Sequence, residues 1–232
     1  MDITSEEGKD MVLVIGHSMV RRAKIAALRT KYWKMDLDDV NISWVGHVNG
    51  RTIKGIRDVE EWFECFPGFV KMFDVIIMDI GTNDLQQEFY DFPENLATKI
   101  WEVAILGRLL GAKRVAISKV MFRDGVPAIP RNFVSDMEQA VRNVKYYEKQ
   151  FNSWAHACNV KLIDLVRRTG SGVVMHFHEG LVKEWRTKLV DGLHLTDDGL
   201  RKYLKNIKSS SIKLTKDVKK NPNPVGLLNK TQ

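Results

Sequence analysis

Three segments of the chain carry side chains whose chemistry suits acyl transfer. Ser18 offers a hydroxyl that can attack a carbonyl carbon once a base removes its proton. Asp191 precedes His194 by three residues, a spacing that lets the carboxylate hold one ring nitrogen while the other accepts the serine proton. Asn83 offers an amide that can donate a hydrogen bond to an oxyanion. Together these side chains supply a nucleophile, a base, an orienting carboxylate and an oxyanion donor.

Each segment also has an ordinary structural interpretation. A serine between a strand and a helix is commonly only the N-cap of that helix, and Asn83 with Asp84 makes a common turn. The Asp-x-x-His spacing also arises by coincidence. The conjunction favours a site, because each segment follows a predicted strand or opens a predicted helix, and the three converge on one end of the sheet.

The elements that must position these side chains alternate between apolar runs and longer segments of helical period, which indicates βαβ units. The predicted strands are residues 11–15, 40–45, 75–80, 114–120 and 160–164. The predicted helices are residues 18–31, 53–64, 93–110 and 134–156, with a last helix capped by Thr196. This order predicts an α/β fold, a three-layer α/β/α flavodoxin-like sandwich with a five-stranded parallel sheet. Ligands of such sheets lie beyond the carboxyl ends of the strands.

Four short segments resemble the sequence blocks of the SGNH (GDSL-type) hydrolases, over about residues 11–205. The matching segments are Gly16-His17-Ser18, Asn49-Gly50-Arg51-Thr52, Gly81-Thr82-Asn83-Asp84 and Asp191-Gly192-Leu193-His194. All four blocks together are much more specific than any one of them. The resemblance implies the SGNH hydrolase fold for nearly the whole folded body.

The resemblance also implies a role for each matching residue. Ser18 would be the nucleophile and His194 the base that Asp191 orients. The oxyanion hole would consist of the Ser18 and Gly50 backbone N–H groups and the Asn83 side chain, with Gly46 as the second candidate for the block-two glycine. No cofactor and no metal is expected.

The implied activity is that of a serine esterase or deacylase, which hydrolyses an O-acyl ester through an acyl-serine intermediate. A short acyl group is expected, because no extended apolar lid segment is present. The substrate would be a small-molecule, glycan or lipid ester. Transfer of the acyl group to an alcohol other than water uses the same residues, so that alternative stays open.

One position departs from the family pattern. The first block usually has Asp between its Gly and Ser, where this chain has His17. The Gly-His-Ser variant, with Gly-Arg-Thr in the second block, resembles a branch found in animals and in retroelement-associated esterase domains. Activity is expected to survive, because the triad is complete without that position.

Three further side chains are candidates for contact with the substrate: His17, Arg123 and His176. Arg123 follows a predicted strand, and His176 lies in the loop that precedes the Asp-x-x-His block. His176 and His178 alternate as metal ligands sometimes do, but no third ligand follows at a matching spacing. No metal site is predicted.

The length of 232 residues, with 44% hydrophobic residues, suits one folded domain and a tail. Residues 1–10 are expected to be a polar segment, residues 11–208 the hydrolase-like domain and residues 209–232 a basic flexible tail. Residues 201–232 hold nine Lys and Arg against one Asp, a net charge of +8 in a chain of net charge +7.

That basic segment supports a second hypothesis, an accessory domain of a mobile element that binds RNA or DNA through residues 209–232. A third hypothesis is a non-catalytic binding domain that has kept the fold. The acidic N-terminus lacks a secretory signal pattern, and no apolar run reaches membrane-spanning length. With only Cys65 and Cys158, far apart in the sequence, a cytoplasmic location is expected.

Overall fold

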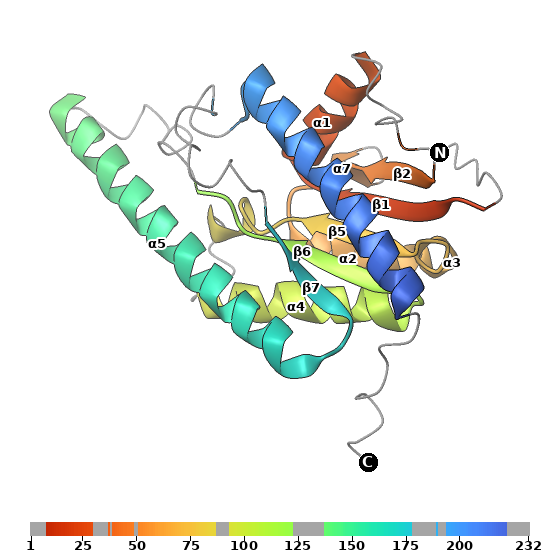
Figure 1. Ribbon diagram of the computed structural model, residues 1–232. Helices are drawn as coiled ribbons and strands as arrows, with labels where there is room; N and C mark the ends of the chain where they lie inside the picture. Colours follow the sequence, from red (N-terminus) through yellow and green to blue (C-terminus); the bar gives the residue numbers. More distant parts are fainter. Residues whose placement is uncertain are drawn as a thin grey trace.

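The computed structural model describes residues 8–29, 37, 39–48, 51–86, 93–122, 137–177, 189 and 194–221. Its central feature is a sheet of five parallel strands in the order β2-β1-β5-β6-β7 (Figure 1). The strands are β1 (Asp10–Gly16), β2 (Val40–Val45), β5 (Val75–Asp79), β6 (Arg114–Ser118) and β7 (Val173–His176). This order is that of flavodoxin-like sheets, so the predicted fold class is confirmed.

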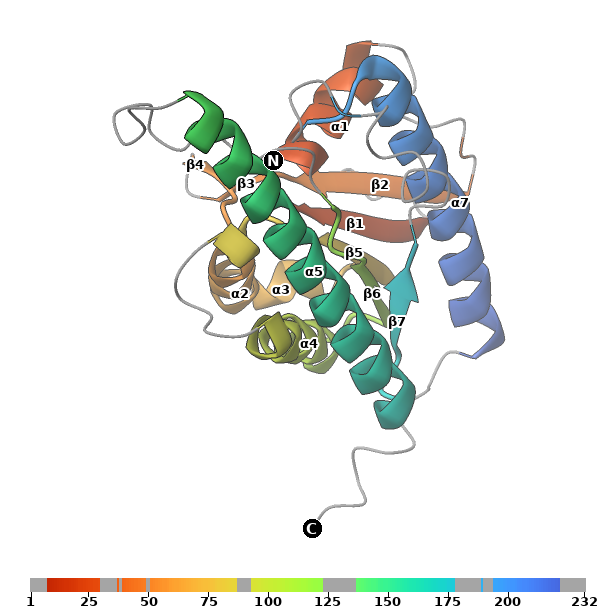
Figure 2. The same ribbon diagram turned by 90° about the vertical axis from the view of Figure 1, so that its left-hand side faces the viewer.

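Helices cover both faces of the sheet, as parallel strands require (Figures 1 and 2). One layer contains α1 (Ser18–Arg29) and α7 (Asp197–Lys220). The other contains α2 (Ile56–Cys65), α3 (Pro67–Val70), α4 (Pro93–Leu109) and α5 (Met137–Thr169). A short hairpin of β3 (His47–Val48) and β4 (Arg51–Thr52) follows β2, and a 3-10 turn, η2 (Asp84–Gln86), follows β5.

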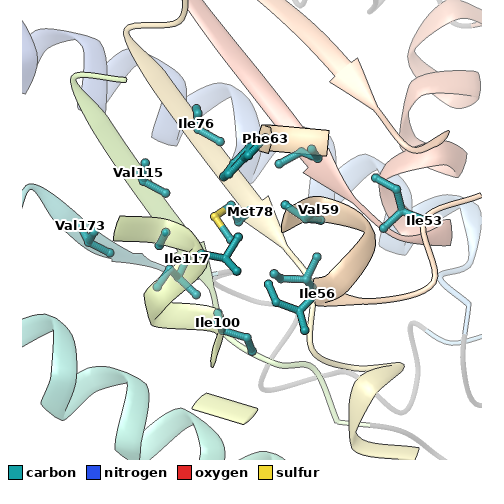
Figure 3. Close-up of a cluster of buried hydrophobic side chains, with 14 of the residues drawn as sticks. Ile53, Ile56, Val59, Phe63, Ile76, Met78, Ile100, Val115, Ile117 and Val173 are labelled. Atoms are coloured by element: carbon teal, nitrogen blue, oxygen red, sulfur yellow. The ribbon is translucent and has the colours of Figure 1, made fainter. Parts of the chain in front are cut away.

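The strands divide their side chains between two cores. In β1, Leu13 and Ile15 pack with α2, α3, α4 and α5, whereas Val12 and Val14 pack with α1 and α7. Figure 3 shows the first core, in which Phe63, Ile76 and Met78 are completely buried. Because every side chain of β5 is buried, this strand is the apolar centre of the sheet that its sequence predicts.

The fifth strand lies elsewhere than the sequence pattern predicts. Residues 160–164, the predicted strand, form part of α5, and the strand is β7 at Val173–His176. The buried residues Phe151, Ala155, Cys158 and Leu162 recur at helical spacing, which outweighs a short apolar run. Gly170 and Gly172, with φ of 52° and 78°, then end the helix and turn the chain into β7.

The C-terminal prediction is wrong for residues 209–220, which continue α7 to Lys220 instead of forming a flexible tail. Ser211, Leu214, Thr215 and Val218 are buried at helical spacing on the layer shared with α1, and this burial stabilises the extension. Residues 222–232 lie outside the described residues. The helix begins as expected, because the Gly199 N–H donates to the Thr196 hydroxyl at 3.1 Å. No described helix is both long and apolar enough to cross a membrane.

Candidate active site

Ser18 is the first residue of α1, two residues beyond the end of β1. The His17 N–H donates to the Asp79 carbonyl at 3.4 Å, and the His17 carbonyl accepts from the Arg21 N–H at 3.3 Å. A Cβ on Gly16 would lie 2.1 Å from the Asp79 carbonyl oxygen, so this corner requires glycine. The chain therefore leaves β1 in close contact with β5 and presents a half-buried Ser18 at a helix N-terminus.

Asn83 leaves the neighbouring strand at the same edge. Gly16 of β1 is paired with Asp79 of β5. Ser18 follows Gly16 by two residues and Asn83 follows Asp79 by four, so both leave the sheet at the same edge. Gly81 turns the chain with a φ of 99°, a conformation that favours glycine. The Leu85 N–H then donates to the Gly81 carbonyl at 3.1 Å and closes the turn that carries Asn83.

Asp84 fastens this turn to the start of α2. Its buried carboxylate accepts the Ile56 N–H at 2.9 Å and the Gly81 N–H at 3.2 Å. Burial raises the pKa of Asp84 to about 6, although these backbone hydrogen bonds oppose the shift. A Cβ on Gly55 would lie 2.2 Å from a carboxylate oxygen of Asp84, so Gly55 gives this contact its room.

Asn159 of α5 supports the same edge from the end of β6. Its side-chain oxygen accepts the Val120 N–H at 2.8 Å, and its amide donates to the Val120 carbonyl at 2.9 Å. Thr82 adds a longer contact, accepting the Met121 N–H at 3.4 Å. Sequence reasoning missed Asn159, because the helix was expected to end at residue 156. The helical spacing of Ala155, Cys158 and Leu162 is the signal that places it on a buried face.

His194 lies two residues before the Thr196 cap of α7, and its side chain is half-buried. The following residue, Leu195, is buried and forms an antiparallel bridge with Leu189. Helix α7 runs antiparallel to the strands, because Tyr203 near its start contacts the end of β5 while Lys219 near its end pairs with Asp10 at the start of β1. His194 therefore enters at the edge where Ser18 and Asn83 lie.

A buried pair joins α7 to that edge. The Tyr203 hydroxyl donates to the Asp79 carboxylate at 2.6 Å, and both residues are almost fully buried. Burial, followed by the charge of Asp79 and this hydrogen bond, raises the pKa of Tyr203 well above its ordinary value. The Tyr203 hydroxyl is therefore held in its protonated, hydrogen-bond-donating form at neutral pH.

Other candidates from the sequence are placed differently. Asp191, Gly50 and Arg123 lie outside the described residues. His17 is 2% exposed and its Nδ1 accepts the Met19 N–H at 3.5 Å, and His176 is 3% exposed with its Nδ1 2.8 Å from the Ser210 hydroxyl. Both rings are therefore buried, which gives no support to the prediction that they contact substrate.

The second candidate for the block-two glycine, Gly46, follows β2 directly. A Cβ there would lie 2.9 Å from the Cβ of Arg21, so close packing against α1 is a sufficient reason for glycine at this position. Within the described ranges no three His, Cys, Asp or Glu side chains gather as a metal site.

A cavity of about 490 Å³ lies away from this edge. It is lined by Arg57, Glu60, Glu61, Glu64, Asn95 and Lys99 of α2 and α4. The Lys99 ammonium pairs with Glu60 at 2.5 Å across it. None of the candidate catalytic residues lines this cavity, so we do not assign it to the site.

No family model matches the sequence, and no curated protein matches it either. Solved structures do match. A GDSL-like lipase from Bacteroides thetaiotaomicron has a TM-score of 0.57 and 13% identity, covering 88% of each chain. The native aryl esterase of M. smegmatis has a TM-score of 0.59 and 13% identity, covering 88% of this chain and 99% of its own.

A carbohydrate esterase family 3 protein from Talaromyces cellulolyticus is similar to the same extent. Its TM-score is 0.56 at 14% identity, covering 90% of this chain and 99% of its own. Identities this low establish a shared fold only. The chain therefore has the fold of the GDSL-type, or SGNH, hydrolases, as its sequence blocks predict.

Proposed function

We propose that the protein is a serine ester hydrolase whose catalytic residues are Ser18, His194 and Asp191. One observation carries the proposal: the start of α1, the turn after β5 and the segment before α7 meet at the carboxyl edge of the sheet. A serine, an asparagine and a histidine thus come from segments at the same edge, on a fold that known esterases share, and this supports the proposal.

The proposed reaction has two steps. The Ser18 hydroxyl attacks the ester carbonyl carbon while His194 takes its proton, and the tetrahedral oxyanion accepts hydrogen bonds from Ser18 N–H, Gly50 N–H and the Asn83 amide. The carbonyl re-forms, and the alcohol leaves with the proton from His194. Water then attacks the carbonyl carbon of the acyl-serine while His194 takes its proton. When this second intermediate collapses, the carboxylic acid leaves and His194 returns the proton to the Ser18 oxygen.

The position of Ser18 supports its proposed role. The partial positive charge of a helix N-terminus stabilises negative charge, and the first turn of α1 contains no acidic residue to oppose it. Asp191 would hold His194 in the tautomer that accepts the serine proton.

For the substrate we propose an O-acyl ester of a small molecule or a glycan, with a short acyl chain. The structural neighbours include a carbohydrate esterase and an aryl esterase, which supports a glycan or small-molecule ester; the short acyl chain is proposed because the sequence has no extended apolar lid segment. An alcohol that replaces water in the second step would make the protein an acyltransferase with the same residues. Product analysis with an added alcohol separates the two outcomes.

The cellular location, the extent of the domain and the branch of the family are also proposals. We propose a cytoplasmic protein whose domain extends from β1 to the end of α7, because α7 contributes buried residues to its last turns. Membership of the animal and retroelement-associated branch rests on the Gly-His-Ser and Gly-Arg-Thr variants in the sequence.

The test is hydrolysis of p-nitrophenyl acetate, butyrate and octanoate by the protein and by its Ser18→Ala variant. We expect Ser18→Ala to lower kcat by about 10³-fold or more, because no other group supplies the attacking oxygen. Ser153→Ala, which changes an exposed serine of α5, is the matched control and should keep full activity. We expect a fluorophosphonate probe to label the protein and the control, but not Ser18→Ala; labelling that persists in Ser18→Ala would exclude this mechanism.

A further inference from the structure

The two helical layers of the molecule differ sharply in charge. Helices α1 and α7 together hold twelve Lys and Arg and three Asp, a net charge of +9. Helices α2, α3, α4 and α5 together hold nine Lys and Arg and nine Asp and Glu, so the other layer has no net charge. Because the whole chain has a net charge of +7, the excess positive charge lies entirely in the α1–α7 layer. Figures 1 and 2 show these two helices adjacent on one side of the sheet.

Most cations of this layer are exposed to solvent. We define the basic face as eight of its exposed Lys and Arg side chains: Arg21, Lys24, Arg29, Arg201, Lys205, Lys213, Lys216 and Lys220. Among the residues that the structure describes, none forms an ion pair with any of these eight. Lys219 is left out, because it pairs with Asp10 at 2.9 Å.

The members on α7 form a line. Arg201, Lys205, Lys213, Lys216 and Lys220 recur at three, four or eight residues, so they share one side of the helix. The exposed residue at the intermediate position, Ser209, is uncharged. At 1.5 Å per residue the line is about 28 Å long, which corresponds to about eight base pairs of a duplex.

A line of cations fits a linear polyanion better than it fits a lipid surface. Surface-bound helices of membrane proteins combine basic residues with exposed apolar ones that enter the bilayer. No large apolar side chain of α7 is exposed among the described residues, and only Ile25 and Leu28 are exposed on α1. The face also has no exposed aromatic ring on either helix with which to stack on bases.

We propose that the basic face binds the phosphate backbone of a nucleic acid without reading its sequence. The line on α7 follows one strand of phosphates, and the cations of α1 add attraction beside it. The proposed interaction goes beyond ester hydrolysis and does not depend on it. It also places the contact on a folded helix, in contrast to the flexible tail that the sequence predicts for residues 209–232.

The test is fluorescence anisotropy with a labelled DNA duplex of 20 base pairs and mixed sequence, between 50 and 200 mM KCl. The variant Lys205→Gln/Lys213→Gln/Lys216→Gln removes three charges from the middle of the line. We expect its Kd to rise at least tenfold, and the slope of log K against log salt to become shallower by about 2.7. The effect should be equal for duplexes of different sequence.

A matched control removes the same charge elsewhere. Lys54→Gln/Lys71→Gln/Arg167→Gln changes three exposed cations that lie outside α1 and α7, and its Kd should stay within twofold of that of the unchanged protein. Ser18→Ala should bind the duplex normally, which separates this inference from the proposed hydrolase activity. Equal losses in the two triple variants would mean a general charge effect and overturn the proposal.

Two other results would also overturn it. One is the absence of duplex binding by the unchanged protein at 50 mM KCl. The other is a sedimentation assay in which the unchanged protein binds vesicles of phosphatidylcholine with 30% phosphatidylserine although it does not bind the duplex. That outcome would identify the basic face as a lipid contact.

Discussion

Asp79 is the residue at which the segments of the proposed site meet. Its carbonyl accepts the His17 N–H next to the proposed nucleophile, and its carboxylate accepts the hydroxyl of Tyr203 from α7. Gly16 lies so close to the same carbonyl that no Cβ fits there. Asp79, which none of the sequence blocks contains, therefore links the start of α1 to α7, whereas Asp84 holds the turn that carries Asn83.

The contact between Tyr203 and Asp79 gives the first residue-scale prediction. Tyr203→Phe removes the hydroxyl that donates to the buried carboxylate of Asp79, so we expect the free energy of unfolding to fall by about 1.5–3 kcal/mol in urea titrations. If the pair also positions α7, kcat for p-nitrophenyl acetate should fall more than KM rises.

Ser211→Ala is the control for this prediction. It removes another buried hydroxyl of α7, which donates to the Ile207 carbonyl at 2.8 Å, but it touches none of the candidate residues. We expect it to change stability without changing kcat. A Tyr203→Phe variant with the kcat of the unchanged protein would show that the pair serves stability alone.

The raised pKa of Asp84 predicts a pH dependence of stability. The carboxyl of Asp84 has a pKa of about 6 in the folded protein and its ordinary pKa of 3.8 in the unfolded chain, so the folded state binds the proton more tightly. The stability contributed by this group is complete below pH 3.8 and is lost as pH rises through 6. At 1.36 kcal/mol per pKa unit the loss amounts to roughly 3 kcal/mol.

Asp84→Asn tests that dependence, because it removes the charge and keeps one acceptor oxygen for the Ile56 N–H. We expect the free energy of unfolding of the variant, relative to that of the unchanged protein, to increase between pH 4 and pH 7. Asp58→Asn, at a half-buried carboxylate near the start of α2, is the control. Parallel pH profiles for Asp84→Asn and the unchanged protein would contradict the prediction.

At the scale of elements, the single helix α7 makes three kinds of contact along its length. Its capped start follows His194, its middle carries Tyr203, and its last three turns bury Leu214 and Val218 against the α1 layer. A basic composition with three consecutive serines resembles a tail, but burial at i and i+4 is what decides that a segment packs as a helix.

Leu214→Ala tests whether the end of α7 belongs to the core. Leu214 is 9% exposed, so we expect a loss of about 2–4 kcal/mol in the free energy of unfolding, measured in guanidinium chloride. Lys213→Ala, at the preceding exposed position, should change it by less than about 0.5 kcal/mol. A flexible segment would give the same small value for both variants.

At the scale of the whole molecule, the sheet separates a basic helical layer from a layer whose charges balance, and the proposed chemistry lies at one edge between them. In the second layer the acidic α2 and α4 are offset by α5, which has a net charge of +3, whereas α1 and α7 are both basic. The proposed nucleophile begins one of the two basic helices and the proposed base precedes the other. A polyanion on the basic face would therefore lie close to the hydrolase site, and hydrolysis measured with and without the duplex would show whether the two influence each other.

The sequence by itself determined the elements whose pattern is local. The apolar run of β5, the strand β1 with the helix that follows it, and the Thr196 cap all appear at or within two residues of their predicted bounds, because periodicity and capping act over a few residues. The order of these elements also predicted the fold, and with it the edge of the sheet at which the proposed site lies.

Only the tertiary structure decided what depends on contacts between distant residues. Tyr203 and Asp79 are 124 residues apart and Asn159 and Val120 are 39 apart, so no local pattern pairs them. The apolar run at residues 160–164 fits a strand as well as a helix, and its packing against α4 and the sheet selected the helix. The same holds for residues 209–220, because a helix with a strongly basic outer side becomes part of a domain only when a core accepts its inner side.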